Sequence, residues 1–351
     1  MHVNELLSIA RQRRASDIHI TAQRNPLFRI DGSLQETEFN LSVDEKRDMI
    51  LSLLIEKQRR RAEEGQDVDT SYETSDGMRH RVNVFHQQQR IAAAIRLLND
   101  KIPTFEELGL PEVLRTLADE PRGLILVTGP TGSGKSTTLA AMIDYVNSKR
   151  ACHILTIEDP VEYVYKQKQA LIHQRNVGED VDSFSTALRS AMREDPDVIL
   201  VGEMRDFETI SAAITAAETG HLVLSTLHTT GAASTIDRII DVFPPHSQQQ
   251  IRTQLAGNLK GVVTQTLLPR AGSPGRVAAF EIMIGTDAVC TLIREGKGHQ
   301  INSNIQTGAR QGMVLLDDYL ANLVRNGVVT RDEAIVKAAN KTEFMSAVSR
   351  V

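Results

Sequence analysis

The sequence is poor in the residues that build disulfide or zinc scaffolds. Its 351 residues include two cysteines, Cys152 and Cys290, which lie far apart and form no CxxC pair. Disulfide frameworks and structural zinc sites need more cysteines at closer spacing, so the sequence argues against both. We therefore expect no zinc and a reducing compartment.

Long apolar runs and an excess of positive charge are also missing. No stretch of about 20 apolar residues is present to cross a membrane, and residues 1–14 lack the apolar core of a signal peptide. The formal net charge is −5 and tryptophan is absent, whereas proteins that coat nucleic acid usually carry a basic face. We expect a cytosolic protein that binds no nucleic acid.

The length suits two domains, and an apolar content of 41% is enough for a buried core in each. We place the first domain at residues 1–98, a connection rich in proline and glycine with one short helix at 99–121, and the second domain at 122–351. Elements predicted in the first domain are a helix at 5–14, strands at 17–20 and 28–30 with a turn at Asp31 and Gly32, a long helix at 42–62, and paired strands at 79–85 and 91–98.

Continuous apolar runs alternate with helical patterns in the second domain. Because strands buried on both faces read as unbroken apolar runs, this alternation predicts a parallel sheet covered by helices, an α/β fold. The predicted strands are 123–128, 153–157, 198–201 and 222–226, and the predicted helices are 136–147, 184–193 and 208–218. From about residue 245 the pattern becomes mainly helical.

The segment GPTGSGKS at 129–136 fits the pattern GxxxxGK[ST] between a predicted strand and a predicted helix. Its glycines let consecutive backbone N–H groups point at phosphate oxygens, and the helix dipole adds positive potential. Lys135 would neutralise the β and γ phosphates, and Ser136 would ligate Mg²⁺. We predict an ATP site whose binding residues are Gly129, Thr131, Gly132, Ser133, Gly134, Lys135, Ser136 and Thr137.

Carboxylates follow two of the predicted strands. Glu203 comes just after the strand at 198–201 and suits a residue that orients or deprotonates water. Glu158 and Glu162 follow another strand, and ligands of open parallel sheets gather at the carboxyl ends of strands. We predict catalytic roles for all three and a Mg²⁺ site at Ser136 and Glu162; which of Glu158 and Glu162 lies nearer the metal stays open.

Two histidines bracket the predicted strand at 222–226. His228 would emerge at its carboxyl end, where it could sense the γ phosphate. A structural role fits the sequence of His228 equally well, and the functional expectation for His221 is weaker. We predict a catalytic role for His228.

Four blocks of sequence together resemble the secretion-superfamily ATPases, the motors of type II secretion and type IV pili. In order they are similar to that family's Walker A, Asp, Walker B and His boxes: GPTGSGKST (129–137), TIEDPVEY (156–163), LRSAMREDPDVILVGEMRD (188–206) and TAAETGHLVLSTLHTTGAASTIDRIIDVFP (215–244). The chain is most similar to the pilus retraction (PilT) family, because it is short and lacks a tetracysteine module. Its segment AVCTLIRE (288–295) resembles the retraction motif AIRNLIRE, except at Val289, Cys290 and Thr291.

The resemblance implies a PAS-like N-terminal domain and a RecA-like P-loop domain with a helical C-terminal extension. It implies a homohexameric ring that hydrolyses ATP to power pilus retraction and twitching motility, working on an inner-membrane platform protein from the cytoplasmic face. It also places the family's γ-phosphate arginines on Arg81 and Arg96. Arginine suits that role because it stabilises the charge that develops on the transferred phosphoryl group.

Other functions stay open at this point. The departures at Val289, Cys290 and Thr291 leave room for a specialised paralogue. A pilus or secretion assembly motor uses the same motifs. A RecA-like nucleic-acid translocase is disfavoured by the acidic net charge, and a ring subunit that does not hydrolyse ATP is disfavoured by the complete set of motifs.

Overall fold

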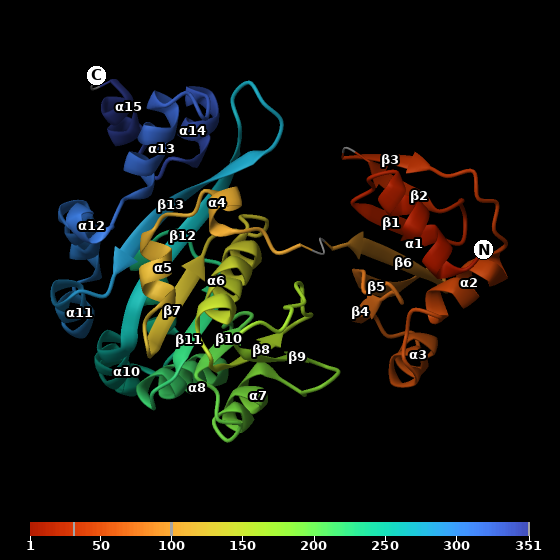
Figure 1. Cartoon of the computed structure of the whole chain (residues 1–351), viewed down its shortest axis with the longest axis horizontal. Coiled ribbons are helices and arrows are strands. Elements are labelled where there is room, and N and C mark those ends of the chain that lie inside the picture. The colour runs from red at the N-terminus through yellow and green to blue at the C-terminus, as the bar shows by residue number, and fades with distance from the viewer. Residues whose placement is uncertain (31, 99–100, 350–351) are drawn as a thin grey trace. The chain divides into compact units, whose positions relative to one another are not determined.

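The structure is a computed structural model that describes residues 1–30, 32–98 and 101–349 (Figure 1). The chain divides into two compact units, one of Met1–Lys101 with Pro160–Val164 and one of Ile102–Asp159 with Tyr165–Val351. Asp31 of the predicted turn and residues 99 and 100 of the predicted connection lie outside the described residues. No helix in the described ranges is long and apolar enough to cross a membrane.

The first unit is an antiparallel sheet in the order β3-β2-β1-β6-β5-β4. Alternate strand residues such as Ile18, Val82 and Ile95 pack in one apolar cluster with residues of all three helices, so the helices cover one face of the sheet. The elements are α1 (Val3–Gln12), β1 (Asp17–Ile20), β2 (Leu27–Ile30), β3 (Ser33–Glu36), α2 (Val43–Leu51), α3 (Glu56–Glu63), β4 (Val68–Glu73), β5 (Arg79–Gln87) and β6 (Arg90–Leu97).

The prediction of one long helix at 42–62 is wrong, because the chain turns between α2 and α3. Leu53 and Leu54 in this break are 3% and 5% exposed. An apolar run this dense cannot lie on one stripe of a single helix, so the change of direction buries it. Gln58 supports the start of α3 by donating to Thr70 Oγ1 at 2.9 Å.

The segment that follows the first unit holds two short helices where one was predicted, α4 (Phe105–Leu108) and α5 (Val113–Ala118). Thr104 caps α4 through its hydroxyl, and Gly109 ends it with a φ of 63°. A helix stop in the left-handed region favours glycine, which explains the break between the two helices.

The second unit contains a sheet of seven strands in the order β13-β12-β7-β11-β10-β8-β9 (Figure 1). Every neighbouring pair is parallel except the hairpin β12–β13. The predicted parallel sheet is thereby confirmed. The strands are β7 (Gly123–Thr128), β8 (His153–Glu158), β9 (Leu171–Asn176), β10 (Val198–Val201), β11 (Leu222–Leu227), β12 (Leu259–Pro269) and β13 (Arg276–Ile284).

Helices connect these strands and form the C-terminal region. The connecting helices are α6 (Lys135–Lys149), α7 (Phe184–Ala191), α8 (Phe207–Glu218), α9 (Ala232–Asp241) and α10 (Pro245–Asn258). The C-terminal helices are α11 (Asp287–Arg294), α12 (Ile301–Thr307), α13 (Leu316–Arg325), α14 (Arg331–Lys337) and α15 (Lys341–Ser349), with 3-10 turns η1 (Gly298–Gln300) and η2 (Ala309–Gln311). The predicted helical C-terminal region is confirmed.

Three strands of this sheet were not predicted. β9 is a short edge strand, and β12 and β13 interrupt the region that was predicted to be mainly helical. Polar residues break the apolar run of β12, yet they are themselves buried: Thr264, Gln265 and Thr266 are 3%, 1% and 8% exposed. A buried polar stretch hides the usual pattern of a buried strand.

Candidate functional site

The predicted phosphate loop has the backbone that its glycines require. It joins β7, which is buried at every residue, to α6. Gly129, Gly132 and Gly134 have φ values of 139°, 77° and 88°, a region that residues with a Cβ rarely adopt. The residue before α6 is Gly134, which has no side chain to cap the helix. The first N–H groups of α6 can therefore bind an anion.

Gln265 of β12 forms a hydrogen bond with the backbone of this loop. The sequence did not indicate this residue. Its Nε2 donates to the carbonyl oxygen of Ser133 at 2.6 Å. A Cβ on Gly129 would lie 2.3 Å from the carbonyl oxygen of Gln265, so only glycine fits there. Within the described part of the chain, the buried atoms Ser133 Oγ and Gln265 Oε1 have no hydrogen-bond partner. Buried polar atoms are normally paired, so this is a place where a ligand can add bonds.

The binding residues of the loop lie where the motif predicts. Lys135 is 8% exposed, and its Nζ donates to the carbonyl oxygens of Gly129 and Pro130 at 2.9 and 3.1 Å. Its charge is thus held at the mouth of the loop. Ser136 and Thr137 follow in the first turn of α6, and Thr131 is exposed at the tip of the loop.

Glu203 and His228 come together at the carboxyl ends of β10 and β11. Glu203 Oε2 lies 2.7 Å from Arg205 Nε and 3.5 Å from His228 Nε2. The side chains of Glu203 and His228 are 21% and 43% exposed. Thr226 secures this edge by donating its hydroxyl to the carbonyl oxygen of Gly202 at 2.7 Å. The structure therefore brings these two predicted residues together and adds Arg205.

Glu158 lies at the same edge of the sheet, at the end of β8. Its Oε1 accepts a hydrogen bond from Thr156 Oγ1 at 2.7 Å. A Cβ on Gly202 would lie 3.3 Å from Glu158 Cα. Because β8, β10, β11 and β7 are parallel neighbours, Glu158, Glu203, His228 and the phosphate loop all follow the carboxyl ends of their strands.

Glu162 lies in the connection between β8 and β9 and is half-buried. It belongs to the segment Pro160–Val164, which is grouped with the first compact unit, while Glu158 belongs to the second. Its predicted part in a metal site therefore stays a prediction.

Arg81 and Arg96 face one another in register on β5 and β6 of the first unit. Arg81 Nη2 lies 2.6 Å from Asp69 Oδ2, and Arg96 Nε lies 3.0 Å from Asp17 Oδ1. Burial alone would raise the pKa of Asp17, but hydrogen bonds from Ser16 and Arg96 outweigh it and hold the pKa below its usual value. Each of the two arginines thus pairs with a different aspartate.

His221 is at the wrong end of β11 for a role beside the phosphates. β11 starts beside Gly123, the first residue of β7, so His221 lies at the amino edge of the sheet. The Nδ1 of His221 lies 2.8 Å from the carbonyl oxygen of Ala216, in the last turn of α8. This contact gives His221 a structural role at the end of α8.

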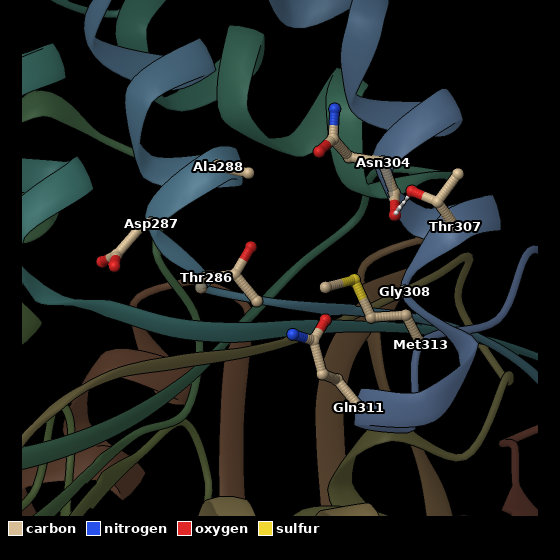
Figure 2. A pocket seen from close by; sticks show the side chains of 9 residues that line it. Thr286, Asp287, Ala288, Asn304, Thr307, Gly308, Gln311 and Met313 are labelled. Atoms are coloured by element: carbon tan, nitrogen blue, oxygen red, sulfur yellow. Dashed lines mark hydrogen bonds between the residues drawn. The ribbon is translucent and has the colours of Figure 1, made fainter.

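A separate hollow of about 590 Å³ lies in the C-terminal region and not at the phosphate loop (Figure 2). The start of α11 lines one side of it and α12 with the turn after it lines the other. Its lining side chains are mostly polar and include Thr286, Asp287, Asn304 and Gln311.

A buried strand, a glycine loop with a lysine, and a following helix, with carboxylates at neighbouring strand ends, define a P-loop nucleotide-binding protein. The chain belongs to the type II/IV secretion system protein family, whose model matches residues 1–344. This confirms the family that the four sequence blocks predict.

Relatives of the chain are similar over nearly its whole length. It is 50% identical to the type IV pilus retraction ATPase PilT of Pseudomonas aeruginosa, over 98% of this chain and 100% of that protein. It is 48% identical to a twitching motility protein of Neisseria gonorrhoeae, over 92% of this chain and 86% of that protein. The crystal structure of the pilus retraction motor PilT with bound ADP matches with a TM-score of 0.92 and 46% identity, covering 98% of both chains.

Proposed function

We propose that this chain is the ATP-hydrolysing motor subunit that powers type IV pilus retraction and twitching motility. The observation that carries the proposal is the convergence of Glu203, Glu158 and His228 with the phosphate loop at one edge of the parallel sheet. The names of the two most similar relatives reported above, a pilus retraction ATPase and a twitching motility protein, support the same function.

Binding of ATP is assigned to the loop and its lysine. The amides at the start of α6 and the ammonium group of Lys135 hold the β and γ phosphates. The bound ADP in the related crystal structure supports the binding of an adenine nucleotide. The hydroxyl of Ser136 and the carboxylates of Glu162 and Glu158 provide hard oxygen ligands, which suit Mg²⁺. When bound, Mg²⁺ neutralises charge on the phosphates.

Hydrolysis needs a group that takes a proton from water. In our proposal Glu203 accepts that proton while the water oxygen attacks the γ phosphorus and the bond to the β-phosphate oxygen breaks, which leaves ADP and phosphate. His228, 3.5 Å from Glu203, senses whether the γ phosphate is present. Arg205 Nε lies 2.7 Å from the same Glu203 oxygen and holds the carboxylate in place.

Arg81 and Arg96 are proposed to stabilise charge on the γ phosphate during transfer. Like charges directly opposite one another in an antiparallel pair destabilise a sheet. The register of β5 and β6 nevertheless places the two arginines opposite one another, and Asp69 and Asp17 offset the repulsion. Because the two arginines repel one another, their pairing suits a functional role in which both guanidinium groups bind an anion.

The working form that we propose is a homohexamer at the cytoplasmic face of the inner membrane, with a pilus platform protein as partner. The first unit, an antiparallel sheet with helices on one face, takes the part of the PAS-like domain, and the second that of the RecA-like motor domain. The segment at 99–121 is proposed as the interdomain connection.

The catalytic assignment is tested by Glu203→Gln in the full-length protein. The amide keeps the shape of the side chain but cannot accept the proton, so kcat should fall at least about 100-fold while ATP binding persists. Glu208→Gln, an exposed position in the next helix, is the control and should keep its activity. A Glu203→Gln protein with wild-type turnover would contradict the assignment.

A second candidate is a pilus or secretion assembly motor, which the same motifs allow. The observation that bears on it is α11, whose sequence keeps Leu292-Ile-Arg-Glu295 but differs from the retraction motif at three positions. Deletion of the gene separates the two functions. Hyperpiliated cells that do not twitch indicate retraction, and cells without pili indicate assembly.

A further inference from the structure

Glu281 is a buried carboxylate for which the proposed chemistry has no use. It lies in the middle of β13, opposite Thr264 of β12, and is 7% exposed. Burial raises its pKa above the usual value. A buried carboxylate is costly unless hydrogen bonds hold it, so its contacts show what it does.

Two helices begin at this carboxylate. Glu281 Oε1 accepts a hydrogen bond from the backbone N–H of Ala232 at 2.7 Å. The backbone N–H of Leu316 also acts on this carboxylate and lowers its pKa, against the larger effect of burial. These are the first residues of α9 and α13. Neither helix has a side-chain cap of its own from the residue before it. Glu281 therefore caps α9, and the first N–H of α13 also favours its charged form, as the dipole at a helix start does.

The first of these contacts anchors the connection that carries His228. This connection, 228–231, links β11 to α9, and Gly231 turns it with a φ of 118°. Its start is fixed by the sheet and its end by the bond between Ala232 and Glu281. His228 lies 3.5 Å from Glu203 within this short span. The position of His228 thus depends on Glu281.

The second contact anchors the C-terminal helices. The chain leaves β13 at Gly285, forms α11 and α12 around the hollow in Figure 2, and returns to pair Val314 with Ile282. Leu316, two residues further on, then meets Glu281. The helical segment 285–313 is therefore closed at both ends on β13, beside the same carboxylate.

We propose that Glu281 is a positioning residue that holds His228 against Glu203 through α9 and couples this contact to the C-terminal helices through α13. The inference rests on the proposed function of the site. It assigns to Glu281 no contact with ATP. Displacement of α11–α13 by a partner would reach the phosphate sensor through one shared carboxylate.

The test is Glu281→Gln in the full-length protein. The amide keeps the size of the side chain but replaces one acceptor oxygen by an NH₂ group that faces an N–H donor. We expect kcat for ATP to fall about tenfold, equivalent to about 1.4 kcal/mol, with KM within twofold because the loop and Gln265 are intact. Hydrogen exchange of the amides of Ala232 and Leu316 should both become about tenfold faster.

The matched control is Thr330→Ala, which removes the cap of α14 in the same region. It should lower Tm without changing kcat or exchange at Ala232. If Glu281→Gln likewise lowers only Tm, or if exchange rises at one helix alone, the proposal is overturned. Should Glu281→Gln fail to fold, Glu281→Asp replaces it: the shorter carboxylate reaches the two amides less well, and kcat should fall about threefold.

A double variant decides whether Glu281 acts through His228. The protein with His228→Ala and Glu281→Gln together should turn over no more slowly than His228→Ala alone. Losses that multiply would overturn the coupling. Failure of the proposed function is a different outcome: the wild-type protein would then hydrolyse no ATP, while the exchange experiment would still report whether one carboxylate caps both helices.

Discussion

The two sheets of this chain present their candidate residues in different ways. In the mostly parallel sheet, Lys135, Glu203 and His228 follow the ends of separate strands and lie at one edge because the strands run in one direction. In the antiparallel sheet, Arg81 and Arg96 lie within strands and meet because of register. A site at strand ends can be predicted from short motifs, whereas a pair within strands requires knowledge of the pairing.

Removal of Lys135 from the phosphate loop should have the largest effect on ATP hydrolysis. Lys135→Ala deletes the ammonium group that donates to the loop carbonyls, so kcat/KM for ATP should fall about 1000-fold. Lys149→Ala at the end of the same helix removes an ion pair with Asp119 and should leave activity unchanged. Steady-state ATPase assays measure both. Equal activity of the two variants would show that the loop does not bind the phosphates.

Removal of an arginine tests whether the antiparallel sheet contributes to the reaction. Arg96→Ala should lower kcat about 100-fold with KM little changed, because the charge it would stabilise develops in the transition state. Arg29→Ala is the control, since Arg29 contacts the same Asp17 at 3.7 Å from the neighbouring strand pair. If both variants lose activity alike, the arginine pair serves the sheet and not the chemistry.

The hydrogen bond from Gln265 to the phosphate loop should affect the binding of ATP more than its turnover. Gln265→Ala removes the 2.6 Å hydrogen bond to the carbonyl oxygen of Ser133, and the KM for ATP should rise about tenfold with kcat nearly unchanged. Gln254→Ala, which removes a surface contact with Glu218, is the comparison and should leave KM unchanged. An unchanged KM in Gln265→Ala would place the control of loop geometry elsewhere.

The remaining prediction concerns the stability of the first unit and not its activity. Burial, and then the charge of Arg11, lower the pKa of His80 to about 4. A lowered histidine pKa contributes stability above the unfolded value of about 6.5 that is lost as pH falls towards 4. The free energy of unfolding should therefore be about 2 kcal/mol lower at pH 5 than at pH 7.5.

Urea denaturation measures this difference, with a tryptophan introduced at the half-buried Phe39 as reporter because the chain contains none. His80→Gln should reduce the pH dependence, and the exposed His2→Gln should keep it. An unchanged slope in His80→Gln would assign the effect to another group.

The comparison of the sheets also explains what could be predicted from the sequence. The phosphate loop, Glu203 and His228 follow recognisable strands, so their shared edge could be inferred. Gln265 could not, because the polar residues around it disguise a buried strand. Glu281 could not either, because β13 was not predicted and only the fold shows that Glu281 meets the first residue of α9.

The prediction of one long helix at 42–62 is wrong for a related reason. Helical periodicity continues across Leu53 and Leu54, whereas the chain turns there and leaves the two side chains 3% and 5% exposed. Burial by the tertiary fold overrode the local pattern. The roles of Arg81 and Arg96 are predicted only from the resemblance to the family, because the composition of their strands does not distinguish them from ordinary strand residues.

The bond between Gln265 and Ser133 sets an order of events during synthesis. The two residues are 132 positions apart, so on the order of 10 s of translation separates them at typical rates. Throughout that interval the glycine loop exists without the strand that shapes it, and a nascent chain should bind nucleotide poorly. Competence for ATP would then mark a chain that has been made at least as far as β12.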